Sequence, residues 1–176
     1  DSIGVMTLHQ IADLVRHYFG RKPQISLLLS YLPYARYDRR MTTYDSHSLK
    51  VFGDMLNGIG FNEVIVDDMH SYVPEGIINN LYERYNQTQT FEIAMARNNI
   101  DPRAYDYFIA PDNGAIKKSQ KITKEWNVPL MVAAKKRDEA SGYTVFDYLV
   151  TNGLETKDKT CIILDDICDG GATFIN

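Results

Sequence analysis

Hydrophobic positions follow two different periods along the chain, which indicates strands that alternate with helices. Short and mostly apolar runs of strand length occupy 25–32 and 63–67. Between these runs, apolar residues recur at spacings of three and four, as on one face of a helix: Leu49, Phe52, Leu56 and Ile59. The first half of the chain is therefore expected to contain strand, helix and strand in that order.

Polar and glycine residues mark where these helices should begin and end. Asp45 or Ser46 is expected to cap the helix of the first half, and Gly58 with Gly60 to end it. A further helix is expected ahead of the first strand, with one apolar face: Ile11, Leu14, Val15 and Tyr18.

The second half repeats the alternation. We expect strands at 107–110, 130–134 and 161–164, a helix over about 114–126, and a partly alternating segment at 143–150. The segment from Tyr82 to Ile100 is polar and helical in character, and we place a domain boundary there. The pattern predicts an α/β fold with parallel sheets, divided into domains at 1–85 and 86–176.

Composition narrows the class of protein. The chain is 44% hydrophobic and 24% charged, which is ordinary for a soluble globular protein and excludes disordered and fibrous classes. A net charge of −4 argues against nucleic-acid or membrane partners, so any anion site must be local. The two cysteines suit reduced thiols in the cytoplasm, and no stretch is long and apolar enough to span a bilayer. The pattern stops where a further helix is due, so we expect an internal portion of a longer polypeptide.

The most informative segment lies near the C-terminus. The apolar run 161–164 is typical of a central strand in a parallel sheet and is followed by Asp165 and Asp166. These carboxylates can accept hydrogen bonds from vicinal hydroxyls. The residues that follow can turn backbone N–H groups toward a phosphate at the start of a helix: Asp169, Gly170, Gly171, Ala172 and Thr173. One loop could thus hold both ends of a ribose phosphate, although each half alone is often only a turn.

Three other segments carry candidate chemistry. The basic loop 33–40 follows a strand, where ligands collect in α/β sheets, and its arginines can pair with phosphate or stack on a base. His70 and Asp112 also follow strands, and Lys135 with Arg137 forms a basic cluster that we place in a polar loop. Taken singly, each has a plainer interpretation as a solvated loop or a packing residue.

Taken in order, these segments resemble the ribose-phosphate pyrophosphokinase family, also called phosphoribosyl pyrophosphate synthetases. The resemblance runs from about Ser26 to Thr173, and its last segment resembles the phosphoribosyl-pyrophosphate motif of type I phosphoribosyltransferases. It implies tandem phosphoribosyltransferase-like domains. Residues 1–85 would be the latter part of the first domain, on the ATP side, and 86–176 the earlier part of the second, on the ribose-phosphate side.

The resemblance also implies an activity and a role for each residue. Family members transfer the diphosphate of Mg-ATP to the 1-hydroxyl of ribose 5-phosphate, giving phosphoribosyl pyrophosphate and AMP for nucleotide or NAD biosynthesis. Lys135 and Arg137 match the catalytic pair, and His70 and Asp112 match positions near Mg²⁺. The ATP-binding positions are Arg36, Tyr37, Asp38, Arg39 and His70. The ribose-phosphate positions are Asp165, Asp166, Asp169, Gly170, Gly171, Ala172 and Thr173.

Departures from the family pattern keep alternatives open. Tyr37 stands where many members carry Gln, and Gly170 replaces a Thr whose hydroxyl helps to enclose the 5-phosphate. The same transfer to a larger acceptor such as ADP-ribose is one alternative. A phosphoribosyltransferase and a non-catalytic regulatory paralogue are the others. The resemblance further implies a homo-oligomer.

Overall fold

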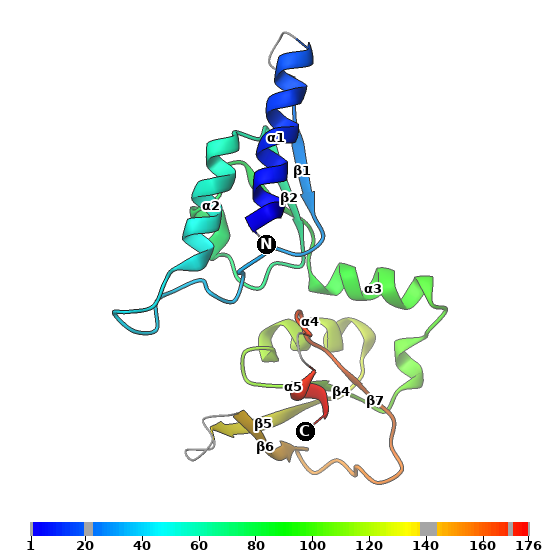
Figure 1. Ribbon diagram of the computed structural model, residues 1–176. Helices are drawn as coiled ribbons and strands as arrows, with labels where there is room; N and C mark the ends of the chain where they lie inside the picture. The colour runs from blue at the N-terminus through cyan, green and yellow to red at the C-terminus, as the bar shows by residue number, and fades with distance from the viewer. Residues whose placement is uncertain (1, 20–22, 138–143, 169–170, 176) are drawn as a thin grey trace. The chain divides into compact units, whose positions relative to one another are not determined.

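The computed structural model describes residues 2–19, 23–137, 144–168 and 171–175, and the chain divides into two compact units (Figure 1). Unit 1 is Asp1–Asn86 and unit 2 is Gln87–Asn176. Each unit has its own sheet, helices and buried cluster, so each is described by itself.

Unit 1 is built on a three-stranded parallel sheet in the order β1-β2-β3. Its elements are α1 (Ser2–Phe19), β1 (Ser26–Leu29), α2 (Ser48–Ile59), β2 (Glu63–Asp67), the 3-10 helix η1 (Val73–Gly76) and β3 (Leu81–Tyr85). In this sheet Leu27 of β1 lies opposite Val64 of β2, and Val64 lies opposite Leu81 of β3. The parallel sheet expected from the sequence is confirmed. The segment 81–85 is a strand, however, where the sequence pattern favoured helix.

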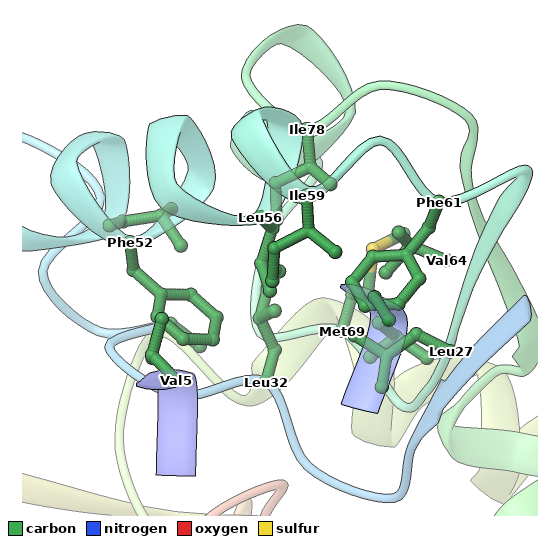
Figure 2. Close-up of a cluster of buried hydrophobic side chains, with 14 residues drawn as sticks. Val5, Leu27, Leu32, Phe52, Leu56, Ile59, Phe61, Val64, Met69 and Ile78 are labelled. Atoms are coloured by element: carbon green, nitrogen blue, oxygen red, sulfur yellow. The ribbon is translucent and has the colours of Figure 1, made fainter. Parts of the chain in front are cut away.

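The core of unit 1 lies between the sheet and its helices (Figure 2). The apolar face of α2 is buried as expected. Its Phe52, Leu56 and Ile59 belong to one buried cluster with Leu27 and Val64 from the strands, and Figure 2 labels these side chains. Burying a side chain of this size contributes about 1.5–3 kcal/mol. This face therefore holds α2 against the sheet and positions the loops that follow β1 and β2.

The ends of α2 differ in how well the sequence predicted them. Gly60 adopts a left-handed φ of 73° and its N–H bonds to the carbonyl of Leu56, so the expected end at Gly60 is confirmed, whereas Gly58 lies inside the helix. The expected cap was wrong, because α2 begins at Ser48 and the Asp45 side chain bonds to residues that precede it in the chain. The carboxylate of Asp45 accepts the N–H groups of Met41 at 3.0 Å and Thr42 at 2.7 Å.

Helix α1 buries a different face from the one expected. Ala12 and Val5 lie in the core, whereas Ile11, Leu14 and Tyr18 are exposed. Because α1 packs against α2, the small side chain of Ala12 allows a close approach that the larger residues would prevent.

Unit 2 is built on a four-stranded sheet in the order β6-β5-β4-β7. Its elements are α3 (Gln87–Arg97), η2 (Pro102–Ala104), β4 (Tyr107–Ala110), α4 (Ile116–Trp126), β5 (Leu130–Arg137), β6 (Thr144–Val150), β7 (Cys161–Ile163) and α5 (Ala172–Ile175). Strand β4 pairs in parallel with β5 and β7, while β6 pairs antiparallel with β5. Its buried cluster includes Phe91, Phe108, Ile122, Val128 and Leu164.

Strand β7 departs from its expected place. The apolar run suggested a central strand, but within the described residues β7 lies at the edge of the sheet and Cys161 is exposed. Leu164, just beyond the strand, is the residue of this segment that is buried. None of the helices in the described part of the chain has the length and apolar character needed to cross a membrane.

Candidate functional site

Three strands of unit 2 bring candidate residues to one edge of the sheet. Ile109 of β4 lies opposite Met131 of β5 and opposite Ile163 of β7, so the carboxyl ends of these parallel strands meet at the same edge. Asp112 follows β4 and Asp165 follows β7. Open α/β sheets bind their ligands at this edge.

Strand β5 is longer than predicted and contains both basic candidates. Lys135 and Arg137 were expected in a polar loop, but both lie in the ladder between β5 and β6, opposite Phe146 and Thr144. The strand is longer because β6 pairs with it antiparallel. This pairing provides hydrogen-bond partners for backbone groups of β5 that would otherwise have none. The side chain of Arg137 lies outside the described part.

Lys135 is held close to Asp112. Its Nζ lies 3.7 Å from Oδ2 of Asp112, and its side chain is only 15% exposed. The other oxygen of Asp112, Oδ1, accepts the N–H of Ala115 at 3.1 Å, which fixes the carboxylate just ahead of α4. The ammonium group is therefore positioned at the sheet edge and differs from a fully solvated surface charge.

Asp165 and Asp166 form a linked pair beyond β7. Oδ1 of Asp165 accepts the backbone N–H of Asp166 at 2.9 Å, and Nζ of Lys118 lies 3.3 Å from Oδ2 of Asp166. Burial raises the pKa of Asp165 to about 6, and the hydrogen bond to the Asp166 side chain and the charges of Asp166 and Asp112 act in the same direction. The carboxylates of Asp112, Asp165 and Asp166 thus share one electrostatic environment.

The phosphate-loop candidates are described only in part. Asp169 and Gly170 lie outside the described residues, as do the side chains of Ala172 and Thr173. Gly171 has a left-handed φ of 75°, which glycine adopts without steric cost. Its carbonyl accepts the N–H groups of Phe174 at 2.9 Å and Ile175 at 3.1 Å, so a short helix follows the glycine turn as expected.

In unit 1 the basic loop and His70 follow the neighbouring parallel strands β1 and β2. Arg36, Tyr37 and Arg39 are exposed, and so is His70. Both connections contain a strained backbone position, because Tyr34 has a φ of 62° and Asp68 a φ of 48°. Left-handed conformations of non-glycine residues cost on the order of 1–3 kcal/mol and cluster at ligand sites.

Asp38 differs from its neighbours because it is buried. Its carboxylate accepts a hydrogen bond from Ser71 Oγ at 2.9 Å and pairs with Arg39 at 2.9 Å. Burial alone would raise the pKa of Asp38, but the hydrogen bonds from Arg39 and Ser71 and the nearby charge of His70 outweigh it and lower the pKa. Asp38 therefore joins the loop after β1 to the loop after β2.

The phosphoribosyl transferase domain model matches residues 81–176, which include β4, Asp112, β5 and the acidic loop after β7. The chain belongs to the phosphoribosyl transferase domain family.

Two curated relatives and one solved structure agree with this assignment. The chain is 24% identical over 153 residues to a ribose-phosphate pyrophosphokinase of Clostridium perfringens, covering 87% of the chain and 47% of the relative. It is 29% identical over 173 residues to one from Saccharolobus solfataricus, covering 97% and 56%. The phosphoribosylpyrophosphate synthetase of Mycobacterium smegmatis superposes with a TM-score of 0.73 at 22% identity, covering 96% of this chain and 52% of that one.

The chain thus spans about half the length of the curated relatives that it matches. The resemblance to ribose-phosphate pyrophosphokinases found in the sequence is confirmed. The low identity to the matched relatives, 24% and 29%, makes the chain a divergent member. The assignment of residues 1–85 to the latter part of a first phosphoribosyltransferase-like domain stays a prediction.

The two residues expected near Mg²⁺ belong to different units of the chain. His70 belongs to unit 1 and Asp112 to unit 2, so their joint role stays a prediction. Among the described residues, no group of three or more His, Cys, Asp or Glu side chains is arranged to hold a metal ion. The carboxylates of Asp112 and Asp165 nevertheless suit Mg²⁺, which prefers oxygen ligands and keeps several waters.

Two residues that contact the candidate site were not predicted from the sequence. Ser71 supports Asp38, and Lys118 pairs with Asp166 from helix α4. Neither lies in a recognisable motif. Only contacts between distant parts of the chain reveal them.

Proposed function

We propose that the protein transfers the β,γ-diphosphate of Mg-ATP to the 1-hydroxyl of ribose 5-phosphate, producing phosphoribosyl pyrophosphate and AMP. The observation that carries this proposal is the meeting of Asp112, Lys135 and Asp165 at one sheet edge. The relatives' name, ribose-phosphate pyrophosphokinase, supports the same reaction.

The residues of this edge have chemistry suited to the two reacting partners. With a pKa of about 6, Asp165 is mainly ionised at neutral pH and can accept hydrogen bonds from ribose hydroxyls. Attack on the β-phosphorus places negative charge on phosphoryl oxygens, and Lys135 is a cation held nearby by Asp112. Bound Mg²⁺ would supply further charge neutralisation. Lys135 would then exchange its contact with Asp112 for one with phosphate.

Product analysis of the full-length protein tests the proposal. Incubation with Mg-ATP and ribose 5-phosphate should release AMP and phosphoribosyl pyrophosphate in equal amounts. Asp165→Asn should abolish most of this conversion, whereas the isosteric control Asp158→Asn, at an exposed position between β6 and β7, should retain it. Release of ADP, or no consumption of ATP with any sugar phosphate, would contradict the assignment. Use of phosphoribosyl pyrophosphate without ATP would identify a phosphoribosyltransferase instead.

The same assay decides the acceptor. The loss of a Thr hydroxyl at Gly170 removes one donor from the phosphate end of the loop, so a ribose with an esterified 5-phosphate is the alternative substrate. ADP-ribose that neither reacts nor inhibits at millimolar concentration would exclude it. Faster turnover of ADP-ribose than of ribose 5-phosphate would replace the primary proposal.

A further inference from the structure

Lys118 links helix α4 to the acidic loop after β7. Its Nζ lies 3.3 Å from Oδ2 of Asp166, and the two residues are 48 positions apart in the chain. The Lys118 side chain is 30% exposed and that of Asp166 is 9% exposed. This pair is therefore better shielded from water than an ordinary surface ion pair, which contributes little.

The location of Lys118 is unfavourable for a lysine without such a partner. It lies in the first turn of α4, where the helix dipole disfavours cations, and this turn contains no acidic residue. Its helical neighbours Lys117 and Lys121 are exposed, whereas Lys118 is turned toward the sheet edge. Attraction to Asp166 helps to offset this cost.

The contact continues from Asp166 to Asp165. The backbone N–H of Asp166 donates to Oδ1 of Asp165 at 2.9 Å, so holding Asp166 also fixes the orientation of the Asp165 carboxylate. Lys118 further offsets repulsion in a group of three carboxylates, of which Asp112 already pairs with Lys135. Within the described residues, no ion pair is formed to Asp165 itself.

We propose that Lys118 is a positioning residue for the acceptor sugar. It holds Asp166 and thereby presents Asp165 to the ribose hydroxyls. This inference rests on the proposed function, because it assigns the sugar to the loop after β7.

The test removes the charge of Lys118 with a substitution that keeps a side chain of similar length. In the full-length protein, Lys118→Met should raise the apparent KM for ribose 5-phosphate about tenfold or more, as losses of supporting contacts commonly do, while the KM for ATP stays close to that of the wild type. Lys118→Arg should restore most of the affinity. The control Lys121→Met, an exposed lysine on the same helix, should leave both constants unchanged.

A double variant shows whether Lys118 acts through Asp166. If it does, Lys118→Met combined with Asp166→Asn should bind the sugar about as weakly as Asp166→Asn alone, because the two changes remove the same interaction. Additive losses would overturn the inference. A fall in melting temperature with an unchanged sugar KM, or an equal effect of Lys121→Met, would also overturn it.

Calorimetric titration of ribose 5-phosphate separates this inference from the proposed reaction. If the wild type binds the sugar and Lys118→Met weakens binding, the positioning role stands even where no ATP is consumed. If the reaction proceeds and Lys118→Met binds normally, the positioning role fails and the reaction stands. Absence of sugar binding by the wild type would overturn the positioning role.

Discussion

Ser71 donates a 2.9 Å hydrogen bond to the carboxylate of Asp38, a side chain that is only 3% exposed and lies 33 positions earlier in the chain. This contact joins the loops that follow β1 and β2, which contain the expected ATP-binding residues. The basic loop is thus not a free solvated segment. Its buried acid ties it to the segment that contains His70.

Removing the Ser71 hydroxyl should destabilise unit 1. A hydrogen bond to a buried charged group contributes about 1.5–3 kcal/mol, so Ser71→Ala should lower the free energy of unfolding by roughly that amount. Urea unfolding at pH 7 measures the change. The control Ser30→Ala alters an exposed serine and should change stability by less than about 0.5 kcal/mol.

The pH dependence of the Ser71→Ala effect follows from the lowered pKa of Asp38. A carboxyl group whose folded pKa lies below 3.8 stabilises the fold above that value, and the contribution is lost as the pH falls through the folded pKa. The difference between wild type and Ser71→Ala should therefore be constant near neutral pH and shrink in acid. A difference that grows below pH 3.8 would contradict this account.

Asp165 should show the opposite dependence. Its pKa is raised from 3.8 to about 6, so the folded state binds more protons than the unfolded state between these values. Its contribution to stability therefore falls as the pH rises from 3.8 to about 6 and then stays constant. Asp165→Asn should accordingly be more stable than wild type at pH 7 and nearly equal to it at pH 4.

Unfolding curves of Asp165→Asn and Asp158→Asn at both pH values test this expectation. Asp158 is exposed, so its replacement should leave the pH profile unchanged. Loss of stability in Asp165→Asn at pH 7 would show that the carboxylate is more favourable in the fold than its burial indicates.

Lys135→Ala and Arg137→Ala should each lower turnover by about 10²–10³, the typical cost of removing one donor that stabilises transition-state charge. Folding should change little, because the contact between Lys135 and the half-exposed Asp112 is an ion pair of modest strength and the β5 ladder uses backbone groups. Steady-state kinetics with Mg-ATP provide the measurement. Lys136→Ala serves as a neighbouring control of equal charge, and turnover near wild type in both main variants would remove this segment from the mechanism.

His70→Ala and Asp112→Asn should weaken Mg-ATP binding by about tenfold each, since supporting ligands of a metal site commonly contribute this much. His70 is exposed, so its removal should leave the fold intact, and asparagine retains an oxygen that can accept the N–H of Ala115. Isothermal titration with Mg-ATP gives the affinities. His9→Ala, at an exposed position on α1, is the control, and unchanged affinity in both main variants would return these residues to a structural role.

The sequence by itself determined the alternation of strands and helices and the positions of the loops that contain the candidate residues. Apolar periodicity and turn chemistry act over a few neighbouring residues, which is why the face of α2, the left-handed end at Gly60 and the acids after β7 could be read directly. The same local signals explain why the order of motifs was enough to indicate the family. They do not contain information about which surfaces meet.

Only the tertiary structure decided which surfaces of the chain contact one another. Packing against α2 selected Ala12 over the larger apolar residues of α1, and pairing with β6 extended β5 through Lys135 and Arg137. The contacts of Ser71 with Asp38 and of Lys118 with Asp166 span 33 and 48 positions and depend on the order and register of strands. Their physical basis is the burial of carboxylates, which need partners wherever the folded chain brings them within reach.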